Sequence, residues 1–148
     1  NYARLNLSSL YNAQQRNQDA LRVLREAEKT DPRNGRVNYQ LALLLAELKE
    51  VPGAEEQFRK AIANKYDDPR IYYNYGIIVQ QQGRVKEAEK IFRSGLAVVP
   101  EHEDLNYALA FLLLLQKRDR EALQPALILK KVNPTNPDYK PLFDRLRI

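Results

Sequence analysis

The sequence predicts an all-α fold in which four helix-turn-helix units of 34 residues stack as a solenoid, followed by one capping helix. Three observations predict it: similar residues recur every 34 positions, each unit holds two stretches with apolar residues at helical spacing, and turn residues separate these stretches. Four units of 34 and a last segment of 12 residues account for all 148 residues without an insertion. Because no unit can bury its apolar face alone, neighbouring units are expected to stack.

The repeat places the units at 1–34, 35–68, 69–102 and 103–136, with the capping helix in 137–148, and we expect the whole chain, 1–148, to form a single domain. Two columns of small residues mark the points where the two helices of a unit are expected to cross closely. The first column contains Ser8, Ala42, Gly76 and Ala110. The second contains Ala20, Ala54, Ala88 and Ala122. A larger side chain in either column would push the helix backbones apart.

The helices of the first two units are predicted at 2–15 and 18–30, and at 36–49 and 52–65. The apolar residues of the first unit lie at i, i+3 and i+4 spacing, which is typical of one helical face. Pro52 suits the first turn of its helix, where no backbone N–H is needed. Pro32 ends the first unit, whereas Tyr66 stands where the second unit would have the corresponding proline.

The helices of the last two units are predicted at 70–82 and 85–98, and at 104–116 and 119–132, with the single helix at 138–147. Gly83 lies in the polar break of the third unit, and Pro100 and Pro134 end the third and fourth units. Pro125 falls inside a predicted helix and is expected to bend it.

These columns and the 34-residue period resemble the tetratricopeptide repeat over the whole chain. The resemblance implies a right-handed superhelical solenoid whose first helices line a concave surface and whose second helices lie on the convex side. One departure is visible, because the tryptophan expected early in each unit is replaced in all four. The replacing residues are Arg4, Asn38, Tyr72 and Asn106. The stretches 20–27, 41–46 and 72–76 are also similar to repeat segments of larger bacterial proteins associated with multihaem cytochromes.

The first helices predict a groove that binds an extended peptide or a helix of a partner protein. Tyrosines offer broad, rigid contact surface, carboxamides can donate to and accept from a peptide backbone, and apolar side chains would add selectivity. The alternative is that the tyrosines pack between units and the amides are solvated. The expected contacts are Tyr39, Gln40, Leu43, Tyr73, Asn74, Ile77, Tyr107 and Phe111, with Arg36 and Arg70 flanking them.

Two further classes of function remain open at this stage. The chain could serve as a structural scaffold or spacer in a larger protein, with self-association through an N-terminal end that has no recognisable cap. Its net charge of +5 permits nucleic acid as a partner, but the basic residues are scattered and many alternate with glutamate. Some relatives of this kind grip a C-terminal carboxylate with lysines, asparagines and an arginine, and only Arg70 is compatible with that pattern.

No catalytic residue, metal site or cofactor is predicted. The chain has no cysteine, and its single histidine, His102, lies in an acidic turn whose residues point in different directions. The acidic pair Glu55 and Glu56 belongs to a second helix and is expected to face solvent. The longest apolar run, 108–115, is far short of a membrane span, so we expect a soluble protein. The sequence leaves the compartment open, with the cytoplasm and a bacterial periplasm as the two candidates. The chain begins with Asn1, and further residues are expected upstream in the parent protein.

Overall fold

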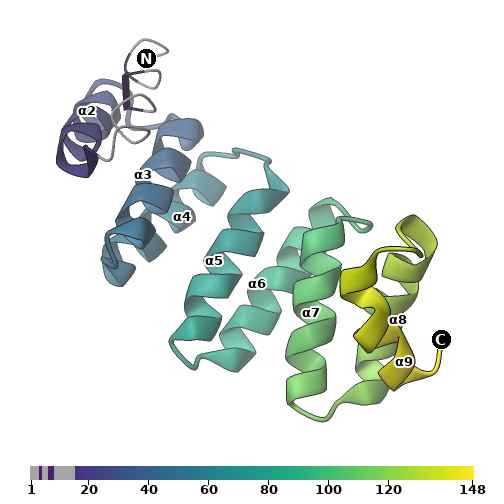
Figure 1. The fold of residues 1–148 in the computed structure, drawn as a ribbon. Helices are drawn as coiled ribbons and strands as arrows, with labels where there is room; N and C mark the ends of the chain where they lie inside the picture. Colours follow the sequence, from purple (N-terminus) through teal and green to yellow (C-terminus); the bar gives the residue numbers. More distant parts are fainter. Residues whose placement is uncertain (1–3, 5–6, 9–15) are drawn as a thin grey trace. The chain divides into compact units, whose positions relative to one another are not determined.

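The computed structural model describes residues 4, 7–8 and 16–148, and it consists of helices joined by short turns (Figure 1). The chain divides into two compact units, 1–67 and 68–148, which are described separately below. Within the described residues there is no β-strand, and the predicted all-α class is confirmed. Most of the helix predicted at 2–15 lies outside the described residues. The expectations of a single domain and of a right-handed superhelix stay predictions.

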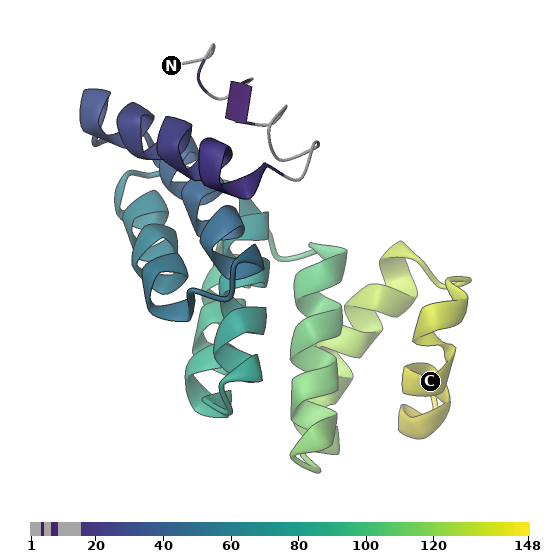
Figure 2. The same ribbon diagram turned by 60° about the vertical axis from the view of Figure 1, so that its left-hand side comes forward.

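Unit 1 contains α2 (Asn17–Thr30), α3 (Gly35–Glu47) and α4 (Val51–Ala63). The helices α3 and α4 form an antiparallel hairpin, and α2 packs against α3 (Figures 1 and 2). Their bounds agree with the predicted ones to within two residues. Ala20 and Ala54 are completely buried, as the small-residue column predicts, and Phe58 fills the interior between α3 and α4.

Unit 2 contains two helical hairpins and a C-terminal segment. The first hairpin is formed by α5 (Pro69–Gln81) and α6 (Val85–Val98), the second by α7 (Glu103–Leu115) and α8 (Asp119–Val132). A 3₁₀ turn, η1 (Pro137–Tyr139), and a short helix, α9 (Lys140–Leu146), follow and lie beside α8 (Figures 1 and 2). The helix α8 continues through the buried Pro125, and the bend expected there stays a prediction.

The helix N-termini follow the 34-residue period. The side chains of Asn34, Asp68, His102 and Asn136, each 34 positions after the last, accept a hydrogen bond from a backbone N–H of the turn that follows. These bonds satisfy donors that would otherwise have no partner at a helix start. For His102 the acceptor is Nδ1, 3.3 Å from the backbone nitrogen of Leu105. The single histidine of the chain therefore has a structural role as a helix cap.

Close helix crossings in unit 2 depend on two glycines. A Cβ added at Gly76 on α5 would lie 2.3 Å from Cε1 of Phe92 on α6. A Cβ added at Gly95 on α6 would lie 2.6 Å from Cβ of Tyr72. The absence of a side chain therefore lets α5 and α6 approach and lets the Phe92 ring occupy the interior.

The buried amide Asn38 shows how unit 1 accommodates one of the missing tryptophans. Its Nδ2 donates to Oε1 of Gln57 at 3.0 Å, and its Oδ1 accepts from Nδ2 of Asn64 at 2.8 Å. This hydrogen-bonded network satisfies polar atoms that burial would otherwise destabilise. In unit 2 the equivalent Asn106 donates to the carbonyl oxygens of Pro100 and His102, at 3.0 and 2.9 Å.

Candidate functional site

The predicted groove residues of unit 1 differ widely in exposure. Tyr39 is only 4% exposed, and its ring lies 5.9 Å from that of Tyr66 and 6.3 Å from that of Phe58. Its ring is therefore part of the core of unit 1, and little of it can meet a ligand. Gln40 and Leu43 are half-buried on α3, and Arg36 is exposed at the start of that helix. Whether these four residues contact a partner stays a prediction.

In unit 2 the predicted residues lie on α5 and α7 and keep more of their surface open. Tyr73, Asn74 and Ile77 on α5 are half-buried. On α7, Tyr107 is half-buried and Phe111 is 48% exposed, with the two rings stacked at 6.2 Å between centroids and 26° between planes. Two aromatic side chains one helical turn apart thus present a continuous apolar surface on α7.

Arg70, predicted as a flanking cation, forms an ion pair with Asp68 at the start of its own helix. Its Nη2 lies 2.6 Å from Oδ2 of Asp68, and its Nε donates to both carboxylate oxygens. This hydrogen bonding to Arg70 lowers the pKa of Asp68, more than burial raises it. The Arg70 charge is thus partly neutralised, which reduces its attraction for an acidic partner. Asn74 donates from Nδ2 to the carbonyl oxygen of Arg70 at 3.0 Å.

A cleft of about 360 Å³ opens between α7 and the C-terminal segment. One wall is formed by α7, and the other by η1 and α9. The lining residues are Tyr107, Phe111, Leu114, Leu115, Asp138, Pro141, Leu142 and Arg145. Leu115 is 61% exposed, so the cleft leaves a leucine and a phenylalanine of α7 largely open to solvent. We name this feature the α7/α9 cleft.

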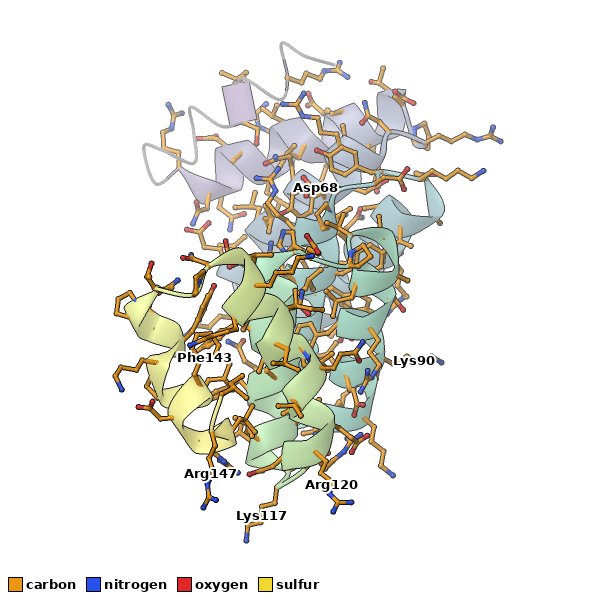
Figure 3. The ribbon with its side chains drawn as sticks, turned by 90° about the vertical axis from the view of Figure 1, so that its right-hand side faces the viewer. Asp68, Lys90, Lys117, Arg120, Phe143 and Arg147 are labelled. Carbon is orange, nitrogen blue, oxygen red and sulfur yellow. The ribbon has the colours of Figure 1, made fainter. Side chains whose placement is uncertain are left out.

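Hydrogen bonds and aromatic contacts hold the second wall of the cleft in place. The hydroxyl of Tyr139 donates to Oε1 of Glu103 at 3.1 Å, and the Tyr139 ring lies 5.3 Å from that of Tyr107. Burial, reinforced by the hydrogen bond to Glu103, raises the pKa of Tyr139 to about 12, so the hydroxyl keeps its proton at neutral pH. Phe143 points from α9 toward α8, where the Lys130 ammonium lies 4.8 Å from the ring centroid (Figure 3).

Arg145 fixes the far end of the same wall. Its Nη2 donates to Oδ1 of Asp119 at 2.8 Å and to the carbonyl oxygen of Leu114 at 3.1 Å. The second bond satisfies one of the free carbonyls at the end of α7. A single side chain therefore joins α9 to both helices of the preceding hairpin.

An ionic network stabilises the α7–α8 turn beside the cleft. Arg118 contacts Oε2 of Glu89 on α6 at 2.7 Å and Oε2 of Glu121 on α8 at 2.5 Å. Hydrogen bonding to Arg118 lowers the pKa of Glu89 despite its partial burial, and it lowers the pKa of Glu121 as well. Both carboxylates are therefore ionised over the physiological pH range.

Sequence reasoning identified only part of the α7/α9 cleft. It identified Tyr107 and Phe111, but it did not include Arg145, which the structure shows bonded to Leu114 and Asp119. It also expected Glu55 to face solvent, and this expectation is wrong because the side chain is 7% exposed on α4. Leu115, the last residue of the apolar run 108–115, was a further signal for the cleft in the sequence.

Neither a cluster of metal ligands nor a membrane-spanning helix occurs among the described residues. In this part of the chain no three side chains of His, Cys, Asp or Glu come close enough to hold a metal ion. No helix within the same residues is long and apolar enough to cross a bilayer. The lining of the α7/α9 cleft is mainly apolar, with Asp138 and Arg145 as its charged residues.

The fold and the 34-residue period together define a helical-repeat protein. The chain belongs to the tetratricopeptide repeat family, because a sequence model of this repeat matches residues 11–73 and 80–147. A second tetratricopeptide repeat model matches residues 52–97. The resemblance drawn from the residue columns is thereby confirmed, and the association with multihaem cytochromes stays a prediction.

Relatives and solved structures agree with this membership. Protein O-mannosyl-transferase Tmtc1 of Drosophila melanogaster is 34% identical over 125 residues, which are 80% of this chain but only 15% of that protein. A tetratricopeptide repeat protein from Parabacteroides merdae superposes with a TM-score of 0.87 at 16% identity, covering 99% of this chain and 59% of that one. YrrB, described as a TPR protein with an unusual peptide-binding site, gives a TM-score of 0.76 at 16% identity, with coverages of 91% and 70%. At these identities the two structures show the fold alone.

Proposed function

We propose that this chain is a non-catalytic protein-interaction module that binds an apolar segment of a partner protein in the α7/α9 cleft. The fold is typical of such modules, and the similar structure YrrB is described as a peptide-binding member of the family. The observation that carries the proposal is the exposure of Phe111 and Leu115 in a cleft whose walls are fixed by internal hydrogen bonds. Covering each of these side chains would contribute roughly 1–2 kcal/mol to binding.

The faces of α5 and α7 would extend the site for the rest of a bound segment. Tyr73 and Asn74 are partly open, and a tyrosine and a carboxamide can hydrogen-bond to a peptide backbone. Tyr107 is partly open as well and leads into the cleft. The proposed contacts are thus Tyr73, Asn74, Ile77, Tyr107 and Phe111 from the sequence, with Leu115 and Leu142 added by the structure.

The experiment is a selection of peptides from a random display library on the intact chain, followed by affinity measurements with two variants. In the first, Phe111→Lys and Leu115→Lys are combined, and because both side chains are exposed the fold should be retained. In the matched control, Val98→Lys alters an exposed apolar residue on α6, away from the cleft. We expect selected peptides with an aromatic or aliphatic anchor whose affinity falls more than about tenfold for the double variant and is unchanged for the control.

Two results would count against the proposal. Peptides that bind the double variant as tightly as the wild type would place binding elsewhere. Failure to select any peptide, together with a mass that rises with concentration in sedimentation experiments, would favour a scaffold that acts through self-association.

A further inference from the structure

The outer face of α8 carries a second apolar surface that the proposed function does not use. Leu123 and Leu127, one helical turn apart, are 38% and 48% exposed. They line a shallow groove of about 550 Å³ together with Ile128 on α8 and Pro100 from the turn before α7. We name this feature the α8 groove. It lies on the side of α8 opposite the buried residues Ala122 and Ala126, which pack inward.

The repeat shows that these leucines are particular to α8. The positions 34 residues earlier, on α6, are Glu89 and Arg93, which form an ion pair with 3.0 Å between oxygen and nitrogen. The equivalent positions on α4 are also an acid and a base, Glu55 and Arg59. A charged pair at this place is therefore compatible with the fold. Two leucines in its stead leave apolar surface in water, which is unfavourable unless another molecule covers it.

The charges at the two ends of the α8 groove differ. At the end where α8 begins, Arg120 borders the groove, and within the described residues it forms no ion pair. Lys117, in the preceding turn, projects from the same end of the hairpin (Figure 3). At the other end, Lys131 is already paired with Glu101. Among the charged residues that line the groove, only Arg120 is therefore left without an ion pair, and this distinguishes one end of the groove from the other.

We propose that the α8 groove binds an amphipathic helix of a partner protein, with its apolar face on Leu123 and Leu127 and its acidic end at Arg120 and Lys117. The distance along α8 from Arg120 to Lys131 is about 16 Å at 1.5 Å per residue, which matches about three turns of a partner helix. A helix presents apolar residues at i, i+3 and i+4 spacing, so it can pack against two leucines that are four residues apart. This surface is separate from the α7/α9 cleft and goes beyond the proposed function.

The test uses the intact chain and two synthetic helical peptides of about 14 residues, since three turns with short flanks need this length. Both peptides carry leucines at i, i+3, i+4 and i+7. In one peptide the residues of one terminal turn are glutamates, and in the other they are lysines. A second pair carries the charges at the opposite terminus, because the direction of the bound helix is not known in advance. Affinity is measured by fluorescence anisotropy.

The variants are chosen from the repeat itself. Leu123→Glu combined with Leu127→Arg writes the ion pair of α6 into α8, so the fold is expected to persist and circular dichroism checks this. Arg120→Glu reverses the uncompensated charge. Phe111→Lys with Leu115→Lys serves as the control, because it alters the α7/α9 cleft and leaves the α8 groove intact.

We expect one acidic peptide to bind the wild type at least about tenfold more tightly than its lysine counterpart, and its affinity to fall by a similar factor in the α8 double variant. Arg120→Glu should reverse the preference, and the cleft variant should bind as the wild type does. Equal binding of acidic and basic peptides, or unchanged binding by the α8 variant, would overturn the proposal. A wild type that dimerises through α8, while the variant stays monomeric, would also overturn it and assign the surface to a second copy of the chain.

Discussion

Replacing Gly76 by alanine tests whether the close approach of α5 and α6 has the geometry described. The new Cβ would lie 2.3, 2.6 and 2.9 Å from three ring carbons of Phe92. These distances are well inside van der Waals contact, and Phe92 is completely buried, so its ring cannot turn out into solvent. Either the ring leaves its preferred rotamer or the two helices separate.

The magnitude follows from two opposing effects. Overpacking of a filled interior costs about 3 kcal/mol at the upper end of its usual range, which applies to contacts this short. Alanine is favoured over glycine in a helix by about 1 kcal/mol. The helix preference offsets part of the overpacking cost, so the free energy of unfolding should fall by about 2 kcal/mol.

A second glycine provides the control. Gly53 lies in α4, and a Cβ added there would meet the nearest side-chain atom, Cδ1 of Leu45, at an ordinary 3.4 Å. Only the helix preference then acts, and Gly53→Ala should stabilise the chain by about 0.5 kcal/mol. Urea unfolding followed by circular dichroism at 222 nm measures both changes. If Gly76→Ala proved as stable as the wild type, or if both variants shifted the midpoint in the same direction, the α5–α6 packing would be wrong.

Three further predictions follow from the local geometry. Lys49 has a φ of 61°, a strained backbone conformation for a residue with a side chain, and Gly83 occupies the same position one hairpin later. Lys49→Gly should therefore raise the unfolding free energy by about 0.5 kcal/mol in a urea titration, and a lower unfolding free energy would contradict backbone strain at this position. Tyr39→Ala should cost about 3 kcal/mol and the half-buried Tyr73→Ala only about 1, and equal losses would refute the different burial of the two rings. Folding raises the pKa of Tyr139 from 10.0 to about 12, so the stabilisation by the protonated hydroxyl is complete below pH 10 and is lost as pH rises toward 12. The difference in unfolding free energy between the wild type and Tyr139→Phe, measured by urea unfolding, should therefore shrink between pH 10 and pH 12.

The sequence was sufficient to predict the helices and the close crossings because both depend on local patterns. Apolar periodicity and turn residues placed the described helices to within two residues, and the alanine column is buried where it was expected. His102 was harder, because histidine is not among the residues that usually cap a helix. The spacing of 34 from Asp68 and to Asn136 was the signal that could have identified its role.

The burial of Tyr39 could not be predicted from its repeat column. The same column contains Tyr73 and Tyr107, which remain partly exposed. The difference has a specific cause. Tyr66 occupies the place of a proline that ends the other 34-residue repeats, and its ring packs against Tyr39. In the next repeat Pro100 stands at the position equivalent to Tyr66, and a proline offers no aromatic ring to pack against Tyr73. A long-range contact with Tyr66, a departure from the repeat pattern, thus decided which tyrosine belongs to the core.

The α7/α9 cleft could not be predicted because it depends on where the last helix docks. The sequence indicated a capping helix, but its position depends on the hydrogen bonds of Tyr139 with Glu103 and of Arg145 with Asp119. These residues are separated by 36 and 26 positions along the chain. No periodicity links them, so only the three-dimensional structure reveals that Phe111 and Leu115 line a cleft.

The measurement that tests the central proposal most directly is methyl NMR of the intact chain, titrated with the tightest peptide selected on it. Methyl groups of Leu114, Leu115 and Leu142 line the α7/α9 cleft, and those of Leu123 and Leu127 report on the α8 groove. We predict that the peptide shifts the first set and leaves the second unchanged. Shifts confined to Leu123 and Leu127, or spread over the buried core, would contradict binding in the cleft.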